Sequence, residues 1–90
     1  MTTIAERITR KLTEALAPQT LEVIDESQRH IGHAGWREGG ETHFRVDIVS
    51  AAFAGKSRLE RHRLVNAALA QELAERVHAL TIGAKAPGEG

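Results

Sequence analysis

Apolar residues recur every three or four positions over the first part of the chain, and charged residues fill most positions between them. This spacing gathers the apolar side chains on one face of a helix. That face consists of Ile4, Ile8, Leu12, Ala15 and Leu16. Thr2 or Thr3 can cap the start, and Pro18 ends the helix just past Ala17, because proline disfavours helical geometry in the residue before it. We therefore predict an amphipathic helix here.

Three later segments have the length and the alternation of β-strands. The clearest is HFRVDIVS, residues 43–50, in which large apolar residues alternate strictly with polar ones. Residues 20–26, TLEVIDE, and residues 77–84, VHALTIGA, show the same pattern over fewer positions. A long glycine-rich connection separates the first two of these strands along the chain.

A second helix is predicted from about Arg58 to Glu75. Its apolar stripe consists of Leu59, Val65, Leu69 and Leu73. Ser57 and Glu60 have the spacing of a capping box, in which each side chain bonds to the backbone of the other residue. The preceding segment, AAFAGKS, has a turn position at Gly55.

The predicted order is therefore helix, strand, strand, helix, strand. A strand–helix–strand connection within one sheet favours a parallel pair with a right-handed crossover, whereas the first two strands are most simply antiparallel. The sequence predicts an α+β fold: a single small domain with two helices on one face of a three-stranded mixed sheet. We place this domain at residues 1–84 and a flexible carboxyl-terminal tail at residues 85–90.

Composition narrows the possible functions. Twelve basic and twelve acidic residues give a net charge of 0, which argues against nucleic-acid binding through a broad positive field. The chain has no cysteine, so histidine and carboxylate side chains would hold any metal, or a partner would bring sulfur. No apolar run approaches the ~20 residues of a membrane helix, and we expect a cytoplasmic protein. No nucleophile elbow, phosphate-binding loop or dinucleotide fingerprint is present, so we do not expect an enzyme.

Three of the five histidines, His30, His33 and His43, lie in or beside the glycine-rich connection. Imidazole nitrogens suit zinc, iron, nickel or copper, and flexible glycines would let several rings converge on one ion. The spacing lacks the paired cysteines of specific zinc motifs, so a solvated histidine-rich loop is the simpler interpretation. His43 begins the clearest strand on the face opposite Phe44, and we expect it to face solvent or the loop.

The other two histidines lie in different surroundings. His62 falls beside the apolar stripe of the second helix, which favours a partly buried, hydrogen-bonded core residue. His78 lies where that helix gives way to the third strand, and there a side chain can reach the surface beside a partner. A basic cluster surrounds the start of the second helix and could meet phosphate, an acidic partner or solvent. It consists of Lys56, Arg58, Arg61 and Arg63.

Three stretches carry a closer likeness: LEVIDES (21–27), GETHFRVDIVSAAFAGKSRLERHRLVNAALAQEL (40–73) and VHALTIGAKAPGE (77–89). Together they closely resemble the BolA family, through the specific combination of HFRV-IVS, F-G-S, RHR-V and VHAL. The resemblance covers nearly the whole chain, from the first helix to the tail. It implies an α-β-β-α-β arrangement similar to class II K-homology (KH) domains, often with an extra short helical turn before the long helix.

The resemblance also implies a function and a ligand set. Members of the family partner monothiol glutaredoxins, and the pair can share a [2Fe–2S] cluster. The glutaredoxin supplies its active-site cysteine and a bound glutathione thiol. The BolA member, a monomer alone and a heterodimer with glutaredoxin, supplies His78 of VHAL and a residue of the loop between the first two strands. The pattern makes His30, three residues after Ser27, the loop ligand, and His33 is the alternative in this lengthened loop.

A second function also follows from the resemblance. Family members are implicated as transcription regulators in responses to stress and changes in cell shape, with DNA contact proposed through the long-helix region. In that case Lys56, Arg58, Arg61 and Arg63 would contact phosphates, and the neutral net charge would make binding local and strongly salt-dependent. Iron–sulfur cluster trafficking and iron homeostasis are the leading expectation, and DNA-binding regulation through the helix after Ser57 is the alternative.

Overall fold

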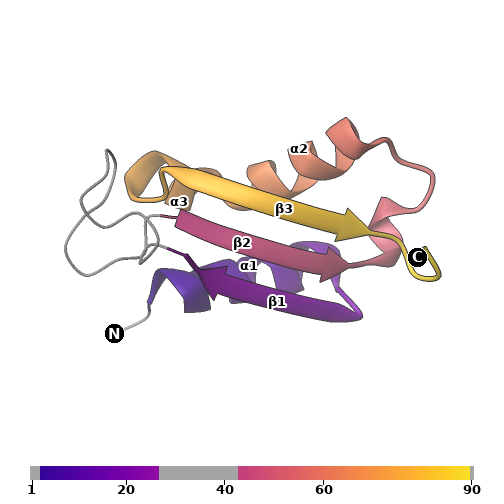
Figure 1. The fold of residues 1–90 in the computed structure, drawn as a ribbon, viewed down its shortest axis with the longest axis horizontal. Helices are drawn as coiled ribbons and strands as arrows, with labels where there is room; N and C mark the ends of the chain where they lie inside the picture. Colours follow the sequence, from indigo (N-terminus) through magenta and orange to yellow (C-terminus); the bar gives the residue numbers. More distant parts are fainter. Residues whose placement is uncertain (1–2, 27–42, 90) are drawn as a thin grey trace.

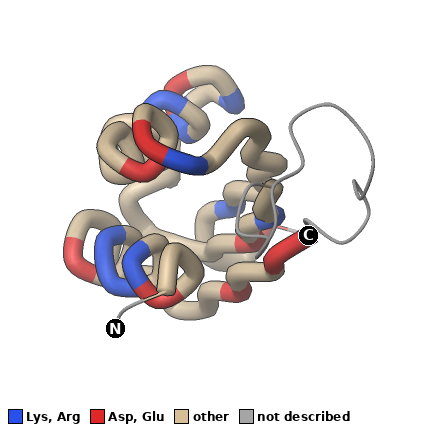
Figure 2. Tube along the Cα trace, turned by 90° about the vertical axis from the view of Figure 1, so that its left-hand side faces the viewer, with Lys and Arg blue, Asp and Glu red and all other residues tan. Residues whose placement is uncertain are grey.

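The computed structural model describes residues 3–26 and 43–89. The elements in these ranges are α1 (Ile4–Leu16), β1 (Thr20–Asp25), β2 (His43–Val49), the 3₁₀ helix η2 (Ala51–Phe53), α2 (Arg58–Ala68), α3 (Ala70–Glu75) and β3 (Ala79–Lys85). The strands form one sheet in the order β1-β2-β3, with β1 antiparallel and β3 parallel to β2. The α-helices lie on one face of this sheet (Figures 1 and 2). The predicted α+β architecture is confirmed, and η2 is the short helical turn that the family resemblance implied.

The hydrophobic core lies between β2 and the helices. Phe44, Val46 and Ile48 of β2 are buried, and the intervening residues are only partly buried, as the alternation predicts. The four strictly spaced apolar residues of α1 are also buried: Ile4, Ile8, Leu12 and Leu16. The central strand therefore packs against the stripe of α1 and against residues of α2 such as Val65.

Local signals fix both ends of α1. The Thr3 side chain accepts a hydrogen bond from the Glu6 backbone N–H, which caps the first turn. Ala17 adopts a left-handed conformation with φ of 44°, and its N–H donates to the Thr13 carbonyl at 3.1 Å. The helix therefore ends at Leu16, one residue earlier than the end predicted from Pro18.

None of the helices in the described ranges is long and apolar enough to cross a membrane.

The second predicted helix is two helices in the structure. The break is at Leu69, whose φ and ψ of −107° and 17° end α2 and begin α3. Leu69 is buried, and α3 then turns Glu72 toward α1. Leu59 was expected on the apolar stripe but is 59% exposed. Leu59 lies six residues before Val65 and therefore about 120° around the helix from that buried residue.

The carboxyl-terminal segment differs from the predicted flexible tail. β3 includes Lys85, so the boundary placed after residue 84 falls inside the strand. Ala86 is buried, and the Glu89 N–H donates to the Ala86 carbonyl across a turn in which Gly88 has φ of 86°. Proline followed by a glycine of positive φ is typical of a type II turn. Residues 85–89 are therefore joined to the domain by pairing and burial.

Candidate functional site

His78 lies in the short connection between α3 and β3, and its side chain is exposed. The backbone before it is fixed. Val77 is buried, and the N–H groups of Arg76 and Val77 both donate to the Glu72 carbonyl, at 3.0 and 2.9 Å. From Ala79 onward the chain is paired with β2. An exposed imidazole on a well-anchored backbone agrees with the surface position predicted for His78.

The ring of His43 stacks on the ring of His78. The ring centroids are 6.2 Å apart and the planes differ by 27°. His43 is only 8% exposed, so the expectation that it faces solvent is wrong, and the loop that was the other expectation lies outside the described residues. The parallel register pairs His43 with Ala79 and so brings the start of β2 beside the residue that precedes β3, which accounts for the contact between the two rings. Alternation along one strand cannot show this, because the contact depends on where a second strand begins.

The two loop candidates, His30 and His33, lie outside the described residues, so their assignment as loop ligands stays a prediction. Within residues 3–26 and 43–89, no group of three or more histidine, aspartate or glutamate side chains could hold a metal ion. The described part of the chain therefore offers His78 as an exposed donor rather than a closed metal centre.

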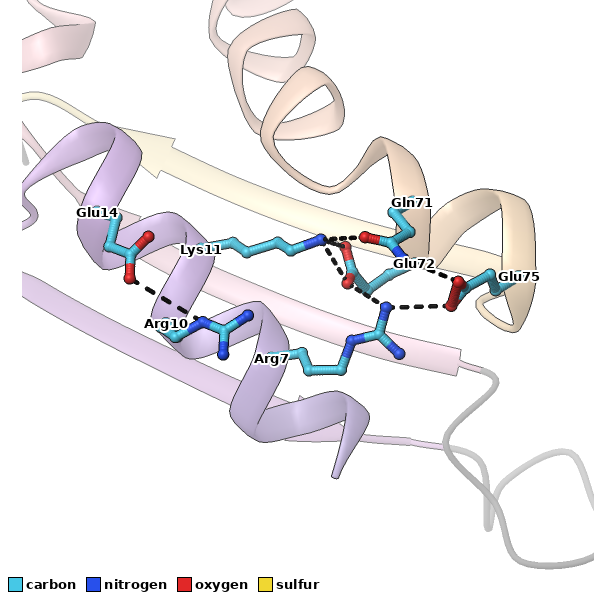
Figure 3. Close-up of polar contacts among 7 residues, drawn as sticks. All are labelled: Arg7, Arg10, Lys11, Glu14, Gln71, Glu72 and Glu75. Atoms are coloured by element: carbon cyan, nitrogen blue, oxygen red, sulfur yellow. Dashed lines mark hydrogen bonds and ion pairs between the residues drawn. The ribbon is translucent and has the colours of Figure 1, made fainter. Parts of the chain in front are cut away.

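A buried carboxylate, that of Glu72, joins α3 to α1 (Figure 3). The side chain of Glu72 is fully buried, and its Oε2 atom lies 2.7 Å from both Arg7 Nη2 and Lys11 Nζ of α1. Lys11 Nζ also donates to Glu72 Oε1 at 2.9 Å, and Arg7 donates to Glu75 at 3.0 Å. Burial alone would raise the pKa of Glu72, but the hydrogen bond from Lys11 and the two positive charges together lower it.

Glu72 was not singled out from the sequence, although a signal was available. It lies seven residues after Val65 and three after Leu69, so it continues the buried stripe as a charged residue. A buried carboxylate needs paired cations, and the positions facing it on α1 supply them. Glu72 thus links α1 through its side chain to the His78 connection through its carbonyl group.

The predicted basic cluster is reorganised by the fold. Arg61 is nearly buried, with 13% of its side chain exposed. It donates to the Lys56 carbonyl at 3.0 Å and the Ala84 carbonyl at 3.2 Å, and two of its nitrogens bind Glu89 at 2.6 and 2.8 Å. The hydrogen bond from Arg61 is the largest cause that lowers the pKa of Glu89, to about 2. Arg61 therefore ties the carboxyl-terminal turn to α2, and Glu89 holds the guanidinium that the DNA-binding alternative placed on phosphate.

The remaining basic residues keep their side chains at or near the surface. Arg58 and Arg63 are exposed and Lys56 is half-buried. The capping box predicted before them is confirmed, since the Ser57 and Glu60 side chains bond to each other's backbone N–H groups. Acidic and basic residues are interspersed along the helices rather than separated onto opposite sides (Figure 2). His62 is half-buried on α2, in agreement with the partly buried position expected of it.

A hollow of about 500 Å³ lies on the sheet, away from the histidine pair. Its lining includes Arg45 and Asp47 of β2, which bind each other through two contacts at 2.9 and 3.1 Å. Gly83 of β3 lies opposite Asp47 in the register, and a Cβ atom there would come 2.6 Å from Asp47 Oδ1. The glycine therefore makes room for this ion pair, which satisfies the two charges within the chain.

Comparisons with known proteins agree on one family. A family model described as BolA-like protein matches residues 12–89. BolA-like protein 1 from Homo sapiens is 55% identical, over 91% of this chain and 57% of its own length. The DNA-binding transcriptional regulator BolA from Escherichia coli is 48% identical, over 88% of this chain and 71% of its own. The solved BolA domain of SufE1 from Arabidopsis thaliana matches with a TM-score of 0.87 and 44% identity, covering 100% of this chain and 99% of that domain.

Proposed function

Because the chain belongs to the BolA family, we propose that it is an adaptor in iron–sulfur cluster trafficking and iron homeostasis that binds a monothiol glutaredoxin. Its partner and glutathione would supply thiolate ligands to a shared [2Fe–2S] cluster, and this chain would supply imidazole. We propose no catalytic activity for it. A cytoplasmic location and a monomer–heterodimer equilibrium with the glutaredoxin are part of the same proposal.

The observation that supports this function is the exposed imidazole of His78 on a fixed backbone. The histidine ligands of this chain fit a shared [2Fe–2S] cluster. A chain without cysteine cannot hold such a cluster alone, but it can complete one whose sulfur ligands come from a partner. When bound, the cluster would supply electron-transfer or cluster-transfer chemistry. His78 would provide a nitrogen ligand, and we propose His30 as the second ligand, with His33 as the alternative.

The test is spectroscopic. The protein is mixed with a monothiol glutaredoxin, glutathione, iron and sulfide, and the visible absorption and circular dichroism spectra are compared with those of the glutaredoxin alone. We expect a distinct spectrum that His78→Ala changes, whereas His62→Ala, at a half-buried histidine of α2, leaves it unchanged. His30→Ala and His33→Ala, made separately, identify the loop ligand. An identical spectrum for wild type and His78→Ala would contradict the proposal.

A second candidate function is DNA-binding regulation of stress and morphology genes, as the name of the Escherichia coli relative suggests. The exposed side chains of Arg58 and Arg63 support it, but Arg61 is occupied by Glu89. The test is retention of promoter DNA at physiological salt. Loss of retention in Arg58→Ala plus Arg63→Ala, with Arg10→Ala as a control on α1, would support this function over the first.

A further inference from the structure

His43 has no part in the ligand set proposed above, yet it is the ring that His78 contacts. The two histidines differ in their surroundings, since His43 is 8% exposed and His78 is exposed. One ring is therefore part of the folded body of the domain, and the other is available to a partner. The question is what a buried imidazole contributes to an exposed one.

The position of His43 is fixed by its neighbours on both sides. It is the first residue of the central strand, where β2 pairs with β3 through the His43–Ala79 register. On the β1 side, the Glu26 N–H donates to the His43 carbonyl at 2.7 Å. With its backbone held from two directions and its side chain buried, His43 presents a ring face of fixed position.

His78 lacks such constraints on its side chain. It lies outside helix and strand, and an exposed side chain there would exchange among rotamers and lose that freedom on binding a ligand. The stacking contact restricts the exchange. A centroid separation of 6.2 Å lies within the roughly 4.5–7 Å range of favourable aromatic pairs, and the small angle between the planes is that of an offset stack.

We propose that His43 is a positioning residue: its ring face holds the imidazole of His78 in one orientation at the surface, ready for a ligand held by a partner. This inference rests on the proposed function, because it concerns the same His78. In this role His43 acts on His78 through the face of its ring. An aromatic substitute should therefore restore the effect, and an aliphatic one of similar size should not.

The first experiment uses the isolated protein, without glutaredoxin. Nuclear magnetic resonance couplings report the χ1 rotamer of His78, and the shifts of its ring protons report the neighbouring ring. We expect one dominant rotamer in wild type and in His43→Phe, and averaging among rotamers in His43→Leu. His43→Met is a second non-aromatic variant in case leucine disturbs the strand, and His62→Leu is the control at a histidine distant in sequence from the pair.

The second experiment measures the affinity of the same variants for the glutaredoxin in the presence of glutathione, iron and sulfide. We expect His43→Leu to weaken formation of the mixed cluster by about threefold to tenfold, the size of an aromatic pair contribution, and His43→Phe to restore it. If phenylalanine fails as leucine does, or if leucine behaves as wild type in both experiments, the proposal is overturned. If wild type forms no mixed cluster, the proposed function fails, and the rotamer measurement alone decides whether His43 orients His78.

Discussion

The ion cluster around Glu72 allows a quantitative prediction. Glu72→Gln keeps the shape of the side chain and removes the charge that lies 2.7 Å from both Arg7 and Lys11. Removing one partner of a fully buried pair costs roughly 3–5 kcal/mol, whereas an exposed pair contributes about 0–1 kcal/mol. The side chains of Arg7 and Lys11 keep 23% and 22% exposure, so they can partly rehydrate. We therefore expect a loss of about 2–3 kcal/mol in the free energy of unfolding at pH 7.

The assay is urea unfolding followed by far-ultraviolet circular dichroism. The midpoint should fall while the slope stays the same, because the surface exposed on unfolding does not change. In thermal unfolding, the same loss corresponds to a decrease of about 10–20 °C in Tm for a domain of this size. The matched control is Glu14→Gln on α1, where the carboxylate is 71% exposed and 4.0 Å from Arg10. It should change the stability by less than about 0.5 kcal/mol.

Acid sensitivity gives a second measurement on the same variant. The pKa of Glu72 lies below its ordinary value of 4.5, so its stabilisation is present above that value and is lost as the pH falls through the lowered folded-state pKa. Wild type should therefore lose more stability on acidification than Glu72→Gln. The reasoning is refuted if Glu72→Gln is within about 0.5 kcal/mol of wild type at pH 7, or if both proteins lose stability equally in acid.

Three further predictions test other parts of the fold. Gly83→Ala should destabilise the protein by about 1 kcal/mol in urea unfolding, because its Cβ would meet Asp47, and should be nearly neutral in an Asp47→Ala background. The pKa of the Glu89 carboxyl group, followed by its carbon-13 resonance, should be about 2, and Arg61→Gln should move it toward 4.5. The stabilisation from this pair is therefore present above pH 4.5 and is lost as the pH falls toward 2. Ser57→Ala should cost about 1 kcal/mol in thermal unfolding through loss of the capping box, and an unchanged Tm would exclude that role.

The parts of the fold that local patterns encode were predictable from the sequence. The apolar positions of α1, the alternation in β2 and the capping box before α2 each depend on residues within a few positions of one another. The strand directions followed from the connection rules, because a crossover helix between β2 and β3 favours a parallel pair. The exposed position of His78 also followed, since it lies where two elements meet.

Two of the features that sequence patterns missed depend on contacts between distant residues. His43 contacts His78 because β3 begins beside it, and Arg61 is withdrawn from the surface because Glu89 returns across a turn. Leu69 ends a helix without proline or glycine. Periodicity describes one element at a time, so it cannot report such pairings. Two features of the sequence could have indicated such contacts: the glutamate Glu72 on an apolar stripe, and the proline–glycine pair of the tail.

These long-range contacts also separate the two proposed functions. Arg61 binds a carboxylate and two backbone carbonyls, so the basic cluster is reduced to three cations that flank the acidic Glu60. DNA binding through so few phosphate contacts would be weak and would decrease steeply with salt. The contacts that hold His78 should depend little on salt, because a ring stack and a hydrogen-bonded backbone respond little to ionic strength. Complex formation with the glutaredoxin that persists at high salt therefore favours the ligand role of His78, and DNA binding that is retained at physiological salt but lost at higher salt favours the nucleic-acid role.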